Sequence, residues 1–184
     1  EAPIFIGGRI SSFMTQSLDM AGLDFEQLLL PTRFDRLVLA GRGEDSGWPH
    51  RDDLYLLRET FLDDCVTNLN RTKRIFISRQ KARRHFQDEH ALEMLLWKMG
   101  FETVVLEELH FNRQVEIFKT AGVVVGSHGA GLANLVFSPP GTKVLEISPA
   151  SHAVNCYRVL SSQLSLEHRT FVVDSPHSHV PGPI

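Results

Sequence analysis

The sequence is poor in cysteine, has no long apolar run and carries no excess of positive charge. Its 184 residues include two cysteines, Cys65 and Cys156, which is too few for a disulfide scaffold or a cysteine-based metal cluster. No stretch approaches the ~20 apolar residues that span a bilayer, so we expect no membrane segment in this chain. The net charge of −3 at pH 7 gives no global field that attracts nucleic acid, and we expect no nucleic-acid partner.

The signatures of several enzyme classes are also missing. The chain has no G-x-S-x-G elbow of a serine hydrolase and no Gly-Lys-Ser/Thr of a P-loop. Its nine histidines do not occur with acids or cysteines at metal-ligand spacings, so we expect neither a metal site nor a bound cofactor. His177, Ser178 and His179 lie in a proline-rich tail that we expect to be unstructured.

What the sequence does contain, from about Lys73 onward, is a regular alternation of short apolar strands and helical patterns. Strands are expected at 74–78, 103–106, 123–126, 143–147 and 169–173. Helices are expected at 88–99, 111–122, 130–137 and 155–164, with Gly122 as the stop of the second. Repeated strand–helix–strand units predict an α/β fold with a Rossmann-like, doubly wound parallel sheet.

The first 70 residues are less regular. Their patterns predict strands at 4–8 and 36–41, a helix at 12–22, a polar Gly-rich loop at 41–53 and a helix at 53–69. We therefore predict a partial N-terminal lobe and linker in 1–50, a Rossmann-like domain in 51–175 and a tail in 176–184.

The stretch GSHGAGLAN, residues 126–134, follows an apolar strand and opens a short helix. Glycines and the free N–H groups of a helix N-terminus together form a favourable anion site. The order G-x-x-G-x-G differs from the dinucleotide fingerprint, and a structural tight turn is the alternative. His128 is placed to donate to a phosphate or to meet a reacting group, or else it is a surface or capping histidine.

The stretch RTKRIFISRQKARRHF, residues 71–86, carries seven basic residues and no acid. Ser78 and Arg79 fall at the carboxyl end of an expected strand, where ligands of open α/β sheets bind. An arginine fork there suits a diphosphate, so we expect Arg79 and Arg83 to contact a ligand. A solvated basic face and a nucleic-acid patch are the alternatives.

Glu146 stands near the end of the apolar strand KVLEI. A carboxylate in a buried strand is costly unless it is paired. It either satisfies an arginine partner or accepts hydrogen bonds from ribose hydroxyls, as an acid does in nucleotide-binding sheets.

Taken together, these segments resemble glycosyltransferase family 61, which includes plant β-1,2-xylosyltransferases and animal O-linked N-acetylglucosaminyltransferases. The resemblance runs from about Lys73 to Val173, and residues 15–40 resemble the end of the family's first lobe. It is carried by RIFISRQKARR, the pair DE before a helix, VVVGSHGAGLANLVFSPPG, VLEISP and YRVLSSQLSLEHR.

The resemblance implies the C-terminal, donor-binding half of a two-lobed GT-B glycosyltransferase with part of the acceptor-side lobe, inverting and metal-independent. Its substrates would be a nucleotide sugar, most often UDP-linked, and a glycan or glycoprotein acceptor. The donor-binding positions that match are Ser78, Arg79, Arg83, His128, Gly129, Ala130, Gly131, Asn134 and Glu146, with His128 also the catalytic candidate. The general base is unplaced; Asp19, Asp24 and Asp45 are candidates without supporting context.

Two other functions stay open on the sequence alone. The chain could be a non-catalytic nucleotide- or protein-binding module derived from such a lobe. An NAD(P)-dependent oxidoreductase is disfavoured by the order of the glycines. We expect a cytoplasmic location, or the lumen of the endoplasmic reticulum or Golgi if the protein is eukaryotic and anchored.

Overall fold

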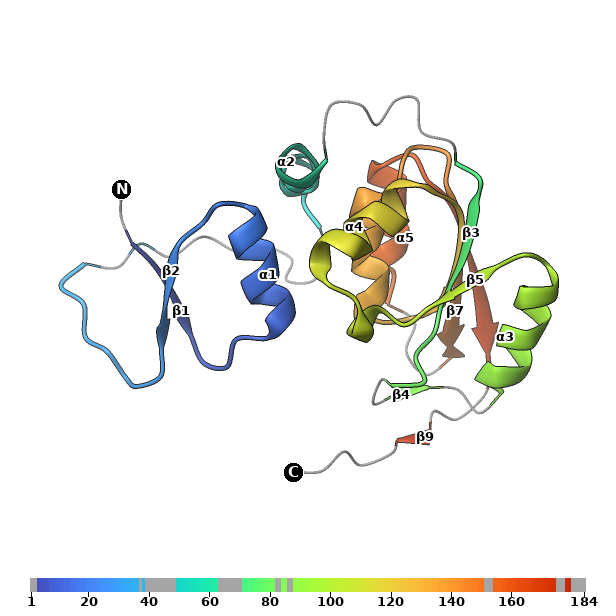
Figure 1. Ribbon diagram of the computed structural model, residues 1–184, viewed down its shortest axis with the longest axis horizontal. Coiled ribbons are helices and arrows are strands. Elements are labelled where there is room, and N and C mark those ends of the chain that lie inside the picture. The colour runs from blue at the N-terminus through green and yellow to red at the C-terminus, as the bar shows by residue number, and fades with distance from the viewer. Residues whose placement is uncertain are drawn as a thin grey trace.

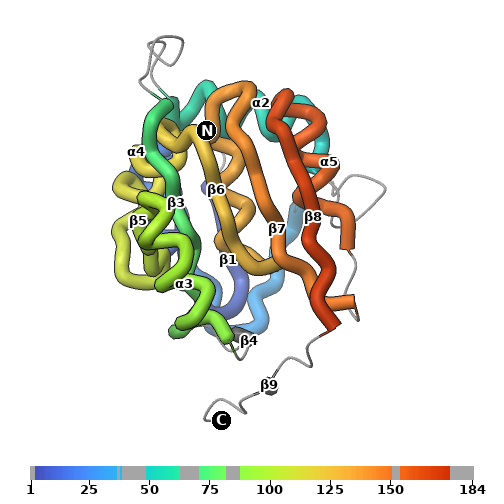
Figure 2. Tube along the Cα trace, turned by 90° about the vertical axis from the view of Figure 1, so that its right-hand side faces the viewer, coloured from blue at the N-terminus to red at the C-terminus, as the bar shows by residue number. Residues whose placement is uncertain are grey.

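The structure is a computed structural model that describes residues 3–36, 38, 49–62, 71–81, 84–85, 88–150, 154–174 and 178–179. Its larger, C-terminal unit is built on a five-stranded parallel sheet in the order β5-β3-β6-β7-β8 (Figure 2). The strands are β3 (Lys73–Ile77), β5 (Glu102–Val104), β6 (Ala121–Ser127), β7 (Lys143–Pro149) and β8 (Glu167–Val173). The α/β class and all five predicted strands are therefore confirmed.

The order of the strands fixes where a ligand is expected. β3 comes first in the chain, β5 is added on one side of it, and β6, β7 and β8 follow on the other. The winding therefore reverses between β3 and β6. In open α/β sheets, ligands bind at the carboxyl ends of the strands at such a reversal.

Helices cover both faces of the sheet, as in a Rossmann-like fold (Figure 1). The helical elements are α3 (Glu89–Lys98), η2 (Leu106–Glu108), α4 (Phe111–Lys119), η3 (Ala130–Phe137) and α5 (Cys156–Gln163). Successive strand residues point to opposite faces, so Ile75 and Ile77 join the core under α4, η3 and α5. Phe76 joins the smaller core under α3.

One predicted boundary is wrong. The helix expected to end at Gly122 ends at Lys119, and Gly122 lies inside β6. A Cβ at Gly122 would overlap the backbone carbonyl of Arg71, so this glycine permits a close approach of two chain segments rather than stopping a helix. The short helix at 130–137 is confirmed, as a 3₁₀ helix.

The N-terminal unit consists of two short parallel strands and a helix: β1 (Ile4–Gly7), α1 (Ser12–Met20) and β2 (Phe25–Leu28). The strand and helix predicted at 4–8 and 12–22 are confirmed. β2 was not predicted, because its sequence FEQL has a polar centre and no apolar run. The strand predicted at 36–41 falls mostly outside the described residues. The helix predicted at 53–69 is α2 (Arg51–Phe61), and residues 63–70 lie outside the described part.

The predicted tail contains one regular contact. Ser178–His179 (β9) pairs antiparallel with Arg84–His85 (β4), so the expectation of an unstructured segment is wrong at these two residues. Within the described ranges, no helix is long and apolar enough to cross a membrane.

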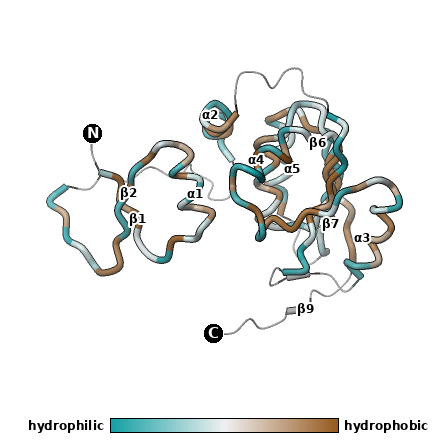
Figure 3. Tube along the Cα trace, viewed as in Figure 1, coloured by the Kyte–Doolittle hydropathy of each residue, from teal (hydrophilic) through white to brown (hydrophobic). Residues whose placement is uncertain are grey.

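The N-terminal unit contacts the C-terminal unit through α1 and α4 (Figure 1). The rings of Phe13 and Phe111 meet edge to face with centroids 5.0 Å apart. The side-chain oxygen of Gln16 accepts a hydrogen bond from the backbone N–H of Phe111 at 2.7 Å. That N–H belongs to the first turn of α4, which has no capping side chain of its own. Figure 3 shows apolar positions along α1, although no residue of α1 is buried.

Candidate active site

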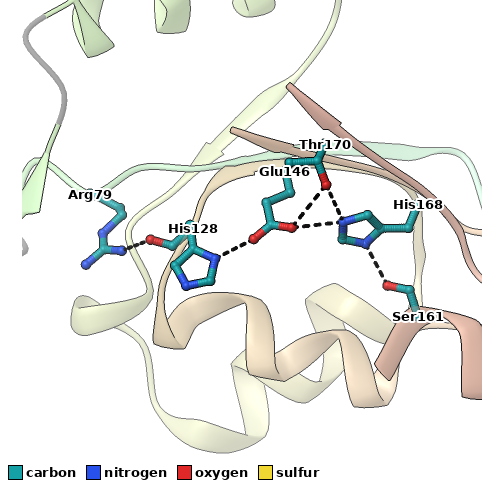
Figure 4. Close-up of polar contacts among 6 residues, drawn as sticks. All are labelled: Arg79, His128, Glu146, Ser161, His168 and Thr170. Carbon is teal, nitrogen blue, oxygen red and sulfur yellow. Dashed lines mark hydrogen bonds and ion pairs between the residues drawn. The ribbon is translucent and has the colours of Figure 1, made fainter. Parts of the chain in front are cut away.

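The two stretches singled out in the sequence meet at the carboxyl ends of β3 and β6. Ile77 and Gly126 are neighbours in the sheet, so Ser78 and Arg79 emerge beside the loop of His128 and Gly129. The Arg79 guanidinium donates to the backbone carbonyl of His128 (Figure 4). A Cβ at residue 129 would overlap this guanidinium, so glycine there lets Arg79 lie over the loop.

Glu89 fixes the turn that carries Arg79, a role that its sequence context did not predict. It lies in the first turn of α3 and is 3% exposed. Its Oε1 accepts from the Ser78 hydroxyl at 2.9 Å and from the backbone N–H of Arg79 at 2.5 Å. The only signal in the sequence was the acid pair before the helix, which indicates a helix start but not a contact eleven residues back.

A second buried network holds the loop after β6 from the opposite side (Figure 4). Glu146, on β7, lies between His128 at 2.5 Å and His168 at 3.0 Å. Burial raises the pKa of the Glu146 carboxyl, but hydrogen bonds and charge from His128 and His168 outweigh it and lower the pKa to about 2. Glu146 is therefore an ionised, acceptor-only group near neutral pH.

The ionised carboxylate determines the direction of these hydrogen bonds. His128 donates through Nδ1–H and His168 through Nε2–H, one to each oxygen of Glu146. When His168 is neutral, its Nδ1 accepts from the hydroxyl of Ser161 at 2.8 Å. Thr170 contacts the carboxylate at 3.5 Å. The chain from α5 through β8 and β7 thus orients the ring of His128.

The contacts of Glu146 and His128 differ from those expected from the sequence. The partners of Glu146 are two histidines, not an arginine, and both of its oxygens are engaged. The His128 side chain is 8% exposed and lies against the ring of Tyr157. A ribose contact for Glu146 and a catalytic role for His128 stay predictions. The contacts present are those that position the loop.

A cavity of about 480 Å³ opens at the reversal between β3 and β6. Of the predicted site residues, those that line it are Ser78, Arg79, Ala130, Gly131 and Asn134. His128, Gly129 and Glu146 are not among the lining residues, and Arg83 lies outside the described residues. The opposite wall is α1, with Ser12, Phe13 and Gln16. The cavity is therefore bounded by both units of the chain.

A chain of carboxamides connects the glycine loop to η2, which also lines the cavity. Asn134 donates to the carbonyl of Gly131 at 3.3 Å and to the side chain of Gln114 at 3.0 Å. Gln114 in turn donates to the carbonyls of Leu106 and Leu109, each at 3.1 Å. Gln114 and Asn134 are both 5% exposed, so this network is internal and rigid. It sets the position of η2 relative to the glycine loop.

The described residues contain no set of side chains arranged to bind a metal ion. Among them, no three His, Cys, Asp or Glu side chains lie close enough together to hold one. The charged groups at the cavity are Arg79 and Glu107. The fold and site thus define a Rossmann-like α/β domain with an arginine and a glycine loop facing a cavity that both polar and apolar side chains line.

Sequence comparison identifies the family to which this domain belongs. Residues 10–145 match the profile of the family Glycosyltransferase 61, and the chain is a member of that family. It is 33% identical over 72 residues to a beta-1,2-xylosyltransferase of Oryza sativa subsp. japonica. It is 31% identical over 74 residues to an EGF domain-specific O-linked N-acetylglucosamine transferase of Drosophila melanogaster. These matches cover 39% and 40% of this chain, and 14% of each relative.

Proposed function

We propose that this chain binds the donor of a glycosyltransferase and takes part in moving a sugar from a nucleotide sugar to a hydroxyl of a glycan or glycoprotein. One observation carries the proposal: the Arg79 guanidinium lies over Gly129, at the carboxyl ends of β3 and β6, and faces the cavity. In this position it would meet a diphosphate with a two-pronged hydrogen-bond donor. The first residues of η3, Ala130 and Gly131, also line the cavity, and the first N–H groups of a helix have no partners within it.

The proposed reaction is a single displacement that inverts the sugar carbon. The acceptor oxygen loses its proton to a base and attacks the anomeric carbon, while the bond to the diphosphate breaks and its electron pair leaves with the phosphate oxygen. The transition state therefore accumulates negative charge on the leaving group. Arg79 and the loop N–H groups would stabilise that charge with no metal ion required.

The names of the relatives suggest which donors to test. One relative is named as a xylosyltransferase and the other as an N-acetylglucosamine transferase. We propose a UDP-linked sugar of one of these two kinds. We also propose a GT-B arrangement, in which β1, α1 and β2 belong to the first, acceptor-side lobe and α1 faces the donor across the cavity.

A calorimetric panel with this chain tests the proposed ligand class. UDP should bind, whereas GDP and NADH should bind at least tenfold more weakly or not at all, since ~1.4 kcal/mol of discrimination corresponds to a factor of ten. Binding of NADH without binding of UDP would contradict the proposal and favour a dinucleotide enzyme. Release of free sugar from UDP-xylose or UDP-N-acetylglucosamine would further distinguish an enzyme from a binding module.

A further inference from the structure

We infer that the cavity between α1 and the C-terminal unit holds the sugar of the donor, and that Glu107 recognises the sugar's hydroxyls with its carboxylate. The inference rests on the proposed function, because it takes the diphosphate to lie at Arg79. It goes beyond that function by assigning the sugar to a place and to a residue outside the motifs that define the site in the sequence.

Glu107 is the acidic side chain among the described residues that line the cavity. It lies in η2, directly after β5, and has no hydrogen-bond or ion-pair partner in the described part of the chain. Its neighbour Glu108 differs, because Glu108 forms an ion pair with Lys81. Glu107 is therefore available to a ligand. A carboxylate accepts hydrogen bonds through both oxygens, and two adjacent sugar hydroxyls supply two donors.

The protein fixes the distance between Glu107 and the glycine loop. Gln114 donates to the carbonyls of Leu106, the first residue of η2, and Leu109, which follows η2, so Glu107 lies between its two contacts. Gln114 is itself held by Asn134, which contacts the carbonyl of Gly131. Since Gly131 and Arg79 face the same cavity, a group attached to a diphosphate at Arg79 enters a space whose far side is set by η2.

The lining of the cavity combines the Glu107 carboxylate with a largely apolar wall. Ile77, Leu106 and Leu109 are among the apolar side chains, and Phe13 supplies an aromatic ring. The carboxamides of Gln114 and Asn134 are already bonded to each other and to backbone carbonyls. Glu107 would therefore accept from the hydroxyls of a sugar, and the C–H groups of the sugar ring would lie against the apolar wall. A carboxylate also repels a nearby diphosphate, so Glu107 favours binding of the ligand only if it accepts hydrogen bonds from donors on that ligand.

The test compares UDP with two UDP-sugars in matched variants. UDP, UDP-xylose and UDP-N-acetylglucosamine are titrated into the wild-type chain, Glu107→Gln and Glu108→Gln. Both substitutions conserve shape and remove one negative charge, and both residues are solvent-exposed, so neither should unfold the chain. The quantity compared is the ratio of the Kd for UDP to the Kd for the better-bound UDP-sugar.

We expect the wild type and Glu108→Gln to bind one UDP-sugar more tightly than UDP. In Glu107→Gln this advantage should fall by about tenfold, because a hydrogen bond to a charged group is lost, while UDP itself binds as well or slightly better. Equal weakening of UDP and UDP-sugar would overturn the inference and place the nucleoside at Glu107. An unchanged ratio in Glu107→Gln, or a wild type that gains nothing from the sugar, would overturn it as well. Failure of the wild type to bind UDP at all would instead contradict the proposed function on which the inference rests.

Discussion

Glu146 is a buried carboxylate held between two imidazoles, with a side chain that is 3% exposed. An unpaired charge in that position would be strongly unfavourable, whereas each oxygen here accepts an N–H. The residue therefore contributes to stability and orients His128, whose carbonyl receives Arg79. The sequence indicated that Glu146 needs a partner but could not name it, because His168 is 22 residues away and nothing in its own segment points to Glu146.

Replacing Glu146 by Gln should destabilise the fold by about 1.5–3 kcal/mol at pH 7, because charge-assisted hydrogen bonds become neutral and one imidazole faces an amide N–H₂. Urea unfolding measures the change. The matched control is Glu167→Gln, an exposed acid on the neighbouring strand β8, which should change the free energy of unfolding by less than ~0.5 kcal/mol. Equal effects of the two substitutions would contradict the role of the network.

The difference in unfolding free energy between the wild type and Glu146→Gln should depend on pH, and the lowered pKa of Glu146 sets the sign of that dependence. The pKa of Glu146 is lowered from 4.5 to about 2 in the folded chain. The stabilisation by its charged form is therefore complete above pH 4.5 and is lost as the pH falls toward about 2. The difference in unfolding free energy between wild type and Glu146→Gln should shrink across that window. A difference that grew on acidification would contradict the assignment.

Gly129 is the residue on which the position of Arg79 depends most closely. A Cβ at this position overlaps the guanidinium, which is the movable end of a long side chain. Gly129→Ala should therefore displace Arg79 and weaken UDP binding by at least tenfold. It should also lower stability, because φ at residue 129 is +158°, a conformation that alanine rarely adopts. Calorimetry and urea unfolding measure the two effects. Full UDP affinity in this variant would show that Arg79 need not occupy the observed position.

At the scale of elements, the strands were predictable and the contacts between loops were not. β3, β6 and β7 are apolar, β-branched runs buried on both faces, and this pattern is visible in the sequence. Glu89, Gln114 and His168 are polar residues in helices or at strand starts, and nothing local indicates that they contact segments from other parts of the chain. Their roles arise from the strand order, which brings distant segments to one edge.

A substitution at Gln114 tests the connection between the glycine loop and η2. Gln114→Ala leaves the carbonyls of Leu106 and Leu109 without their donor and should destabilise the fold by about 1–3 kcal/mol. Hydrogen exchange should increase in η2 and at Gly131. The exposed carboxamide of the same helix provides the control, since Asn112→Ala should affect neither. Unchanged exchange in η2 would contradict the proposed rigid link.

At the scale of the whole molecule, α1 completes the cavity but is held by few contacts. No residue of α1 is buried, and its docking depends on the ring of Phe13 and the side chain of Gln16. The cavity thus depends on how the N-terminal unit sits against α4. The segments that match the two relatives span 14% of the length of each of them.

Removing the α1 contacts should loosen the N-terminal unit without unfolding the sheet. Phe13→Ala together with Gln16→Ala should increase hydrogen exchange in α1 and in the first turn of α4, because an edge-to-face ring contact and a capping hydrogen bond are lost. Met20→Ala, at the other end of α1 and 44% exposed, is the control. Protection of α1 that survived the double substitution would mean that other contacts hold it.

The central claim is that the diphosphate of a nucleotide sugar binds between β3 and β6 at Arg79. Titration of UDP into wild type and Arg79→Ala tests it most directly, with Arg74→Ala as the control. Arg74 lies on β3, the strand that precedes Arg79, is exposed and is absent from the cavity lining. We predict that UDP binds the wild type and Arg74→Ala equally and binds Arg79→Ala ten- to a hundredfold more weakly, on the order of the loss of a charged hydrogen-bonded pair. Equal UDP affinity in all three proteins would contradict the claim.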